Sequence, residues 1–247
     1  MGREPGGSTA GRELGGSPAR GAAPGPLSPA QVSELLPAVW RTLPWRALGS
    51  GAAMGLLIAG TTRVWEEHYN PWLALNTLRA SALVFALGLA FLLDDPARHT
   101  TATVPTPRPL RQVLRLAVVA PFAALSWIAA ILLVPTGLRP PLGPVTLEAV
   151  TAGVLALALG AAWIRRSQEP EPGVSIAVAL LTLAVLALLL IPEDWTLFVD
   201  PDDPRWADSH ERWWGVLAAA VTMAAVWARE PLGRRGYRRS GAQVSDR

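Results

Sequence analysis

Two ionisable side chains, Arg79 and Glu148, lie inside long apolar stretches of the sequence. A charged group within a membrane is costly, so such residues usually face a partner or a water-filled cavity. Counted at about 1.5 Å per residue from the outer ends of their predicted helices, Arg79 lies roughly 10 to 12 Å deep and Glu148 about 5 Å deep. Asn76 adds a polar group one turn before Arg79, which leaves a small polar pocket near the outer leaflet as a further possibility. We expect an intramembrane polar pair, either part of a substrate or proton path or, more economically, a structural ion pair.

Catalytic and nucleotide-binding signatures are absent from the sequence. It contains no HExxH, GxSxG or GxxxxGK[ST] motif, the patterns that would position a metal, a nucleophile or a phosphate group. The chain also has no cysteine, which excludes disulfides, thiol chemistry and Cys-based metal sites. We therefore expect no enzyme activity, no catalytic residue, no cofactor and no metal. Active transport would need a separate ATP-binding chain or an ion gradient.

The segment from Pro192 to Trp214 combines acidic residues, a histidine and four tryptophans. Three of its aspartates could ligate a hard cation, and His210 with Glu211 could join a divalent metal site, but no spacing matches an EF-hand loop or a zinc signature. The stronger interpretation is an aromatic belt at the outer interface, with acidic residues that keep the loop in water. The aspartates are Asp200, Asp202 and Asp203, and the tryptophans are Trp195, Trp206, Trp213 and Trp214.

The composition is that of a membrane protein. Hydrophobic residues make up 51% of the chain and charged residues only 17%, whereas soluble domains carry about 25% charged residues. All 22 basic residues are arginine, a bias typical of a GC-rich coding sequence and suggestive of an actinobacterial source. The arginines stand between apolar runs and form no stripe on one polar face, so no nucleic-acid partner is expected despite the net charge of +3.

The apolar runs predict the fold class. A helix needs about 20 apolar residues to cross the hydrocarbon core, and six runs approach that length. Their continuous apolar character excludes barrel strands, which alternate. We therefore predict an all-α polytopic membrane bundle of six transmembrane helices. The predicted spans are Ala47–Thr62, Trp72–Leu93, Leu116–Val134, Val145–Ile164, Val174–Ile191 and Trp213–Ala228.

Arginine positions predict the orientation. Cytoplasmic flanks of membrane helices accumulate positive charge, while acidic residues count for little. Arginine-rich segments alternate along the chain with segments that hold fewer arginines and most of the acids, which predicts a multi-pass cell-membrane protein with both termini inside. The predicted inside arginines are Arg41 and Arg46, then Arg98, Arg108, Arg111 and Arg115, then Arg165 and Arg166, and finally Arg229, Arg234, Arg235, Arg238 and Arg239.

The regions flanking the membrane domain at 47–229 differ in composition. Residues 1–27 are rich in Gly, Pro and Ser and predict a disordered cytoplasmic tail. Residues 28–46 combine Trp, Arg and bending prolines, which predicts an interfacial amphipathic segment, with a plain linker as the alternative. Residues 230–247 form a basic cytoplasmic tail.

Small residues recur at every fourth position in two predicted spans. This spacing lines one helix face and allows close approach of backbones, so both helices are expected in the bundle interior or at a subunit interface. The residues are Gly51, Gly55 and Ala59 in the first span, and Ala152, Ala156 and Gly160 in the fourth.

The long inside loop from Leu92 to Arg115 carries the residues of a family resemblance. Its sequence, LLDDPARHTTATVPTPRPLRQVLR, resembles stretches in actinobacterial membrane proteins described as ABC transporter permeases of the type-two exporter class. Six spans with both ends inside and an amphipathic segment before the first add to the resemblance. It implies a permease that dimerises, or pairs with another permease, and couples to an ATP-binding subunit. The outer loops are shorter than the family pattern.

Under this interpretation the same loop is the candidate coupling loop to the ATP-binding partner. It is the longest inside loop, begins with paired acids and ends in arginines. Its Pro-containing dipeptides are expected to keep it extended and not helical. The candidate coupling residues are Asp94, Asp95, Arg98, Arg108 and Arg111.

Two functions remain open from the sequence. The first is an integral membrane subunit of a transport system, an ABC exporter permease with a separate ATP-binding subunit. The alternative is a non-transporting accessory, scaffold or self-resistance protein that binds a partner through its acidic outer loop. The scarcity of intramembrane polar residues favours an apolar cargo or no cargo, and a membrane-embedded enzyme is the most distant alternative.

Overall fold

The computed structural model describes residues 37, 39–94, 108–167, 171–192, 195 and 197–228, and this part of the chain is helical, without a strand. The predicted tails at 1–27 and 230–247, most of the segment at 28–46, and the coupling residues Asp95 and Arg98 lie outside the described residues. Of the predicted interfacial segment, residues 39–42 are helical, and Trp45 and Arg46 already belong to the first long helix.

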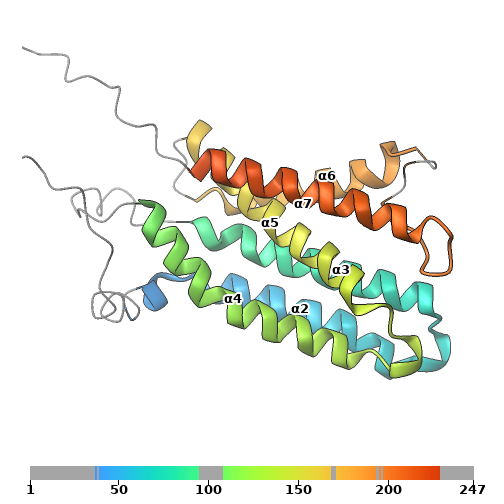
Figure 1. The fold of residues 1–247 in the computed structure, drawn as a ribbon. Coiled ribbons are helices and arrows are strands. Elements are labelled where there is room, and N and C mark those ends of the chain that lie inside the picture. The colour runs from blue at the N-terminus through green and yellow to red at the C-terminus, as the bar shows by residue number, and fades with distance from the viewer. Residues whose placement is uncertain are drawn as a thin grey trace, which may run out of the picture.

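Six long helices follow one another along the described chain, with 3₁₀ turns after α2, α3 and α4 (Figure 1). The long helices are α2 (Trp45–Val64), α3 (Pro71–Ala90), α4 (Arg108–Leu133), α5 (Leu142–Arg166), α6 (Gly173–Leu190) and α7 (Trp206–Ala228). The 3₁₀ turns are η1 (Glu66–His68), η2 (Phe91–Leu93) and η4 (Thr136–Leu138).

Two helices begin about two turns before the spans that the sequence predicted. The stretch from Arg108 to Arg115, expected to be extended, is the first part of α4. Proline is tolerated in the first turn of a helix, where its missing N–H leaves no hydrogen bond unmade, so Pro109 starts this helix and does not prevent it. Likewise, α7 begins at Trp206 and not at Trp213. Asp203 accepts a hydrogen bond from the backbone N–H of Arg205 just before this helix starts.

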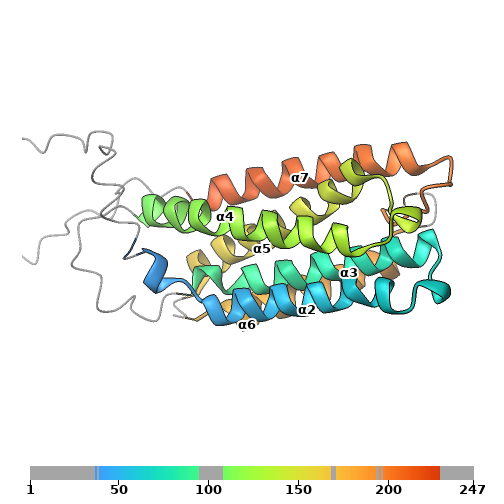
Figure 2. The same cartoon turned by 90° about the horizontal axis from the view of Figure 1, so that it is seen from below.

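Successive helices run in opposite directions, so their connections gather alternately at the two ends of the bundle (Figure 2). The beginning of α2 and the end of α7 lie at the same end, together with η2, the beginnings of α4 and α6 and the end of α5. We call this the terminal end, and we call the opposite end, where α3, α5 and α7 begin, the loop end. Six antiparallel helices with both outer helix ends on one side are the arrangement that six membrane crossings require.

The core lies around α3, with buried residues from α2, α4 and α5 packed together. Helix α3 packs against both α2 and α5, α7 packs on α5, and α4 packs on α2. The predicted small-residue face of α2 is a packing face. A Cβ atom added to Gly51 would lie 3.0 Å from the Cα atom of Gly88 in α3, and Ala59 is fully buried. In α5, Ala156 is buried and Gly160 faces Leu93, which confirms the prediction for the second stripe as well.

The outer helices expose apolar side chains that a soluble domain would bury. Only 17% of the apolar window of α6 is buried inside the structure, against 50% for the window that includes α3. Exposed apolar surfaces of this extent mark an interface with a partner or a membrane. The exposed residues include Leu125, Ile128 and Leu132 of α4 and Val178, Val185, Leu188, Leu189 and Leu190 of α6.

Four of the long helices are long and apolar enough to cross a membrane by length and composition: α3 with η2, α4 from Gln112, α5 and α6. Helices α2 and α7, predicted as the first and last spans, have 20 and 23 residues but do not meet that criterion. The first part of α7 carries Asp208, Glu211 and Arg212. Crossing by α2 and α7 stays a prediction, together with the orientation.

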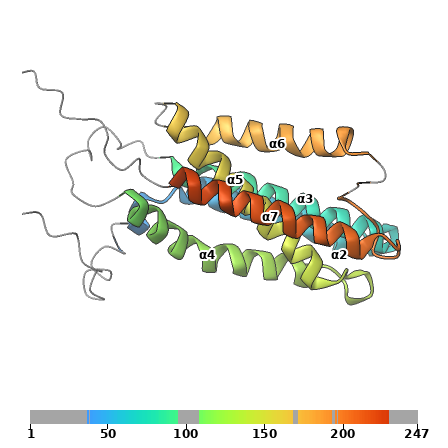
Figure 3. The ribbon, with the colours of Figure 1, turned by 45° about the horizontal axis from the view of Figure 1, so that its top comes forward.

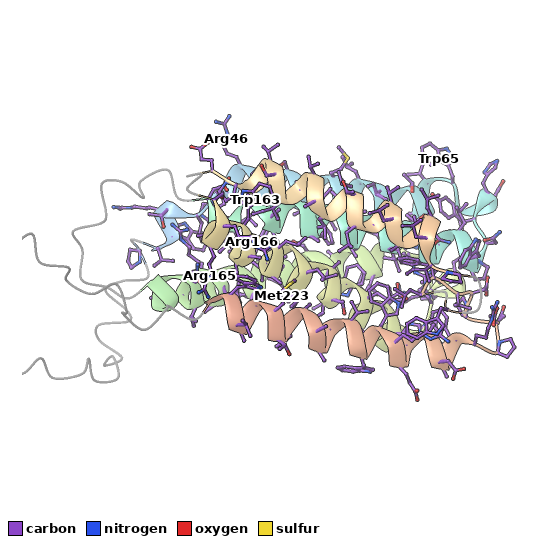
Figure 4. All side chains as sticks on the ribbon, turned by 90° about the horizontal axis from the view of Figure 1, so that it is seen from above. Arg46, Trp65, Trp163, Arg165, Arg166 and Met223 are labelled. Carbon is purple, nitrogen blue, oxygen red and sulfur yellow. The ribbon has the colours of Figure 1, made fainter. Side chains whose placement is uncertain are left out.

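The two ends of the bundle carry different side chains. In Figure 4, Arg46, Arg165 and Arg166 lie toward the terminal end, and Trp65 lies at the loop end. Arg165 donates a hydrogen bond to the carbonyl oxygen of Val226 at 3.0 Å, near the C-terminal end of α7. A positive charge at this position complements the helix dipole.

Candidate functional site

The structure brings Arg79 of α3 and Glu148 of α5 into direct contact. Arg79 Nε donates to Glu148 Oε2 at 2.7 Å and Nη2 donates to Oε1 at 2.9 Å. Both side chains are buried, with 9% and 4% of their surfaces exposed. A bidentate guanidinium–carboxylate pair fixes both distance and orientation, so it locks α3 and α5 in register near the loop end.

His210 of α7 joins this pair from a third helix. Its Nδ1 atom lies 2.8 Å from the carbonyl oxygen of Trp206, and because a carbonyl oxygen only accepts, Nδ1 donates the hydrogen. The other ring nitrogen, Nε2, lies 3.2 Å from Glu148 Oε1, although its direction does not satisfy hydrogen-bond geometry. That contact is attractive when Nε2 also carries a hydrogen. We call Arg79, Glu148 and His210 the polar cluster.

Aromatic rings enclose the Arg79 guanidinium. Its Cζ atom lies 5.7 Å from the ring centre of Trp72 and 5.4 Å from that of Phe198, within the range of cation–π attraction. Asn70 caps the start of α3 by accepting from the N–H of Leu73. Trp72 stands in the first turn that this cap defines. The beginning of α3 therefore places an aromatic ring and the guanidinium about two turns apart on the same face of the helix.

The connection between α6 and α7 folds back over the polar cluster. The carbonyl oxygen of Val199 accepts from Arg79 Nη2 at 3.3 Å, and the indole N–H of Trp213 donates to the carbonyl oxygen of Leu197 at 3.0 Å. The rings of Phe198 and Trp213 are in edge-to-face contact at 5.7 Å. Residues 197–199 thus form a cover held by side chains of α3 and α7.

Two nitrogen atoms of the cluster have no hydrogen-bond partner. Arg79 Nη1 and His210 Nε2 are buried and make no hydrogen bond with any of the described residues. Burying an N–H group without an acceptor is costly, and more so for a charged group. Arg79 Nη1 therefore lacks an acceptor in this arrangement of the side chains, in which the atom has almost no accessible surface of its own.

A cavity of about 500 Å³ opens beside the polar cluster. Arg79, Glu148 and Asn76 form its polar part, and the amide nitrogen of Asn76 already donates to the carbonyl oxygen of Trp72. Apolar side chains from α3, α5, α6, α7 and the cover make up the rest of the lining, among them Leu83, Leu155, Leu183, Ala184, Ala187, Leu197, Phe198 and Val216. Its size falls within the roughly 300 to 1,000 Å³ of pockets that take small organic ligands.

The cavity lies where α6 stands apart from α7. Helix α6 packs on α5, α3 and η2, but makes no comparable contact with α7, and Figure 3 shows α6 set apart from α7. Residues Leu183, Ala184 and Ala187 of α6 line the cavity, while its other face exposes apolar side chains such as Val185. In a membrane, that exposed face would contact lipid.

The candidate coupling residues fall on two sides of a gap in the described chain. Asp94 Oδ1 accepts from the backbone N–H of Gly173 at 2.8 Å and so caps the first residue of α6. Arg108 and Arg111 lie in the first turns of α4, and their side chains are outside the description, as are Asp95 and Arg98 altogether. The structure therefore gives Asp94 a helix-capping contact, and it does not bring Asp94 to the polar cluster.

The acidic segment before α7 is organised around Arg205. Asp203 accepts from Arg205 Nη2 at 2.9 Å and from the backbone N–H of the same residue, and these hydrogen bonds hold the pKa of Asp203 below its usual 3.8. Asp200 accepts from the N–H of Asp202. No three metal-ligating side chains gather anywhere in the described part of the chain.

His210 was the part of the cluster that sequence reasoning missed. It was weighed only as a loop residue beside Glu211, because α7 was predicted to begin at Trp213. Once the helix starts at Trp206, His210 is buried and Glu211 is exposed on the neighbouring position. If the predicted helix had been extended back toward Asp208, the neighbouring residues His210 and Glu211 would have been placed on different faces of that helix.

Comparison of this chain with protein-family models, with curated proteins and with solved structures gives no match.

Proposed function

We propose that this chain is the membrane subunit of a transport system and that its cargo is a largely apolar compound held in the cavity between α3, α5, α6 and α7. The observation that carries the proposal is a cavity of about 500 Å³ with apolar walls and a charge-paired polar end. Pockets with a few polar groups in an apolar lining are the usual sites for small organic ligands.

The position of α6 supports entry from the lipid phase. One face of this helix lines the cavity and the other is exposed and apolar. An apolar compound is concentrated in the membrane and would reach the cavity between α6 and α7 without crossing water. A transport path for such a compound does not need many polar residues, so the scarcity of polar residues inside the bundle is compatible with transport.

The energy source in this proposal is a separate ATP-binding subunit that docks at the terminal end, on the segment from Asp94 to Arg115. Asp94 caps the first residue of α6, so a movement of this segment would pull directly on a wall of the cavity. Helix capping complicates mutagenesis, since an alanine at position 94 also removes the cap. The Asp94→Asn variant keeps an acceptor oxygen and tests docking alone, by copurification of the ATP-binding subunit in mild detergent.

Filling the cavity tests the proposed function. Ala184 faces the cavity and Val185, its neighbour, is 51% exposed on the outer face of α6. In energised vesicles from the native cell, Ala184→Trp should abolish the uptake of apolar fluorescent compounds that depends on this chain, and Val185→Trp should leave it unchanged. Full uptake by a folded Ala184→Trp variant would refute a cargo site in this cavity.

The alternative function, a non-transporting accessory protein, rests on the loop end. Asp202, Asp208 and Glu211 are exposed there, on a segment ordered by the Asp203–Arg205 contact and the start of α7. Under this alternative, replacing the three exposed acids by their amides would release a bound partner protein, whereas Ala184→Trp would have no effect on function.

A further inference from the structure

We infer that the cavity holds a single-chain amphiphile with a carboxylate headgroup, such as a long-chain fatty acid, with the headgroup at Arg79 and the chain along α6. This inference rests on the proposed function and names the class of cargo. It follows from the hydrogen-bonding capacity of Arg79, the charge of the polar cluster and the shape of the cavity.

The hydrogen-bonding capacity of Arg79 points to an acceptor. The guanidinium is nine-tenths buried, and its Nε and Nη2 atoms are used by Glu148 and Val199. The Nη1 group has no partner among the described residues, while Arg79 itself lines the cavity. Arginine has no acceptor and stays charged, so the missing partner is a hydrogen-bond acceptor, and an anionic oxygen would form the strongest such bond.

The charges of the cluster set the charge of the headgroup. Arg79 and Glu148 neutralise each other, and His210 Nε2 stands 3.2 Å from Glu148 Oε1. An entering negative charge is attracted by Arg79 and repelled by Glu148. A phosphate monoester, with roughly −1.5 to −2 charges at neutral pH, meets the stronger repulsion from Glu148. A carboxylate brings a single charge and is repelled less.

The oxygens of Glu148 argue against a cationic headgroup. Both already accept hydrogen bonds from Arg79, and Oε1 also lies against His210. An ammonium group would have to displace one of these contacts and would stand close to the guanidinium. A cationic amphiphile is therefore disfavoured on charge alone.

The shape of the cavity fits one apolar chain. Its lining continues from Arg79 and Glu148 along Ala152 and Leu155 of α5 and Leu180 to Leu188 of α6, in the direction of the helix axes. An extended chain can lie in this direction with its carboxylate at Arg79 and its end toward Leu180. The cover at residues 197–199 closes the headgroup end.

Binding of dibromostearate and of its methyl ester to the full chain in non-ionic detergent tests the inference. Bromine quenches nearby tryptophan fluorescence, and both Trp213 and Trp72 lie at the site. We expect saturable quenching by the acid and at least about tenfold weaker binding of the ester, which lacks the charge that strengthens the hydrogen bond to Arg79.

Two variants separate the headgroup from the cavity. The paired Arg79→Gln/Glu148→Gln variant keeps a polar contact without charge and should bind acid and ester equally. Ala184→Trp should abolish saturable binding of both, with Val185→Trp as the matched control. If Arg79→Gln/Glu148→Gln does not fold, the comparison of acid and ester on the wild-type chain decides the matter.

The results of these experiments test the carboxylate headgroup separately from the proposed transport function. Equal binding of acid and ester to the wild-type chain, or tighter binding of stearylamine or a lysophosphatidate, would overturn the carboxylate headgroup while Ala184→Trp still tested the cavity. The absence of saturable binding by the acid would also overturn it. The proposed function fails only if Ala184→Trp leaves transport intact.

Discussion

At the scale of single residues, the Arg79–Glu148 pair dominates the energetics of the loop end. Both side chains are almost fully buried, and each satisfies the other through two hydrogen bonds. Removing one partner leaves a buried charge, which typically costs about 3 to 5 kcal/mol, whereas replacing both by apolar residues is often neutral.

We therefore predict that Glu148→Leu lowers the free energy of unfolding strongly and that Arg79→Leu/Glu148→Leu recovers most of the loss. The physical reason is that the double variant leaves no uncompensated charge next to the aromatic rings. Thermal unfolding in detergent, followed by circular dichroism, measures both. Losses that simply add in the double variant would show that the two side chains do not interact.

A second prediction at this scale concerns Asp203, in the connection before α7. Its hydrogen bonds from Arg205 lower the folded pKa below 3.8. A depressed carboxyl pKa contributes stability that is present above the unfolded value and is lost as the pH falls through the folded value. The contribution is small because the group is exposed to solvent.

In a titration followed by carboxyl NMR, Asp203 should therefore have a midpoint below 3.8. The Arg205→Gln variant should return the midpoint to its ordinary value, because both the side-chain hydrogen bonds and the positive charge are lost. An unchanged midpoint in Arg205→Gln would rule out Arg205 as the cause.

The sequence pointed to Arg79 and Glu148 because charges inside apolar runs are conspicuous. It did not point to His210 or Val199, whose roles depend on where α7 begins and how residues 197–199 fold back. Backbone carbonyl contacts of this kind leave no trace in residue types. The unpartnered Nη1 atom of Arg79 likewise emerges only from three-dimensional geometry.

At the scale of helices, the closest packing is between α2 and α3. A Cβ atom at Gly51 would meet backbone atoms of α3, 3.0 Å from Gly88 Cα and 3.2 Å from Val84 O, whereas at Gly60 it would meet nothing within 4 Å. Backbone atoms cannot rotate away as a side chain can, so α2 and α3 would have to separate. Both glycines lie inside the same helix.

This difference predicts opposite effects of the same substitution. Gly60→Ala should stabilise the protein by up to about 1 kcal/mol, since alanine is the better helix former. Gly51→Ala should destabilise it, because the overlap with α3 outweighs that gain. Thermal unfolding of the two variants in one detergent compares them, and equal stabilisation by both would contradict close packing at Gly51.

The sequence predicted these helices well in their middles and poorly at their ends. The apolar runs predict the middle of each helix, because apolar side chains are needed both against lipid and in the core. The first turns of some helices are polar, so an apolar run does not reveal where those helices begin. The starts of α4 at Arg108 and α7 at Trp206 were therefore missed. In both α4 and α7, the helix begins among charged residues, which a search for apolar membrane spans leaves out.

At the scale of the whole molecule, the six antiparallel helices separate two chemically different ends. The terminal end carries Arg46, Arg165 and Arg166, and the loop end carries Trp65 and the acidic segment before α7 (Figure 4). This separation agrees with the arginine alternation of the sequence. The sequence suggested only a small polar pocket beside Asn76 and Arg79. The size and apolar lining of the cavity were not predicted, because they depend on how α6 packs apart from α7 (Figure 3).

Cysteine labelling tests the membrane arrangement most directly, because the chain has no cysteine of its own. Single cysteines at Glu67 and Asp202 report on connections at the loop end, and one at Ser167 reports on the terminal end. With six crossings and both termini inside, a membrane-impermeant maleimide should label Glu67→Cys and Asp202→Cys in intact cells and Ser167→Cys only after permeabilisation. Labelling of Ser167→Cys and Asp202→Cys from the same side would contradict the six-helix membrane bundle.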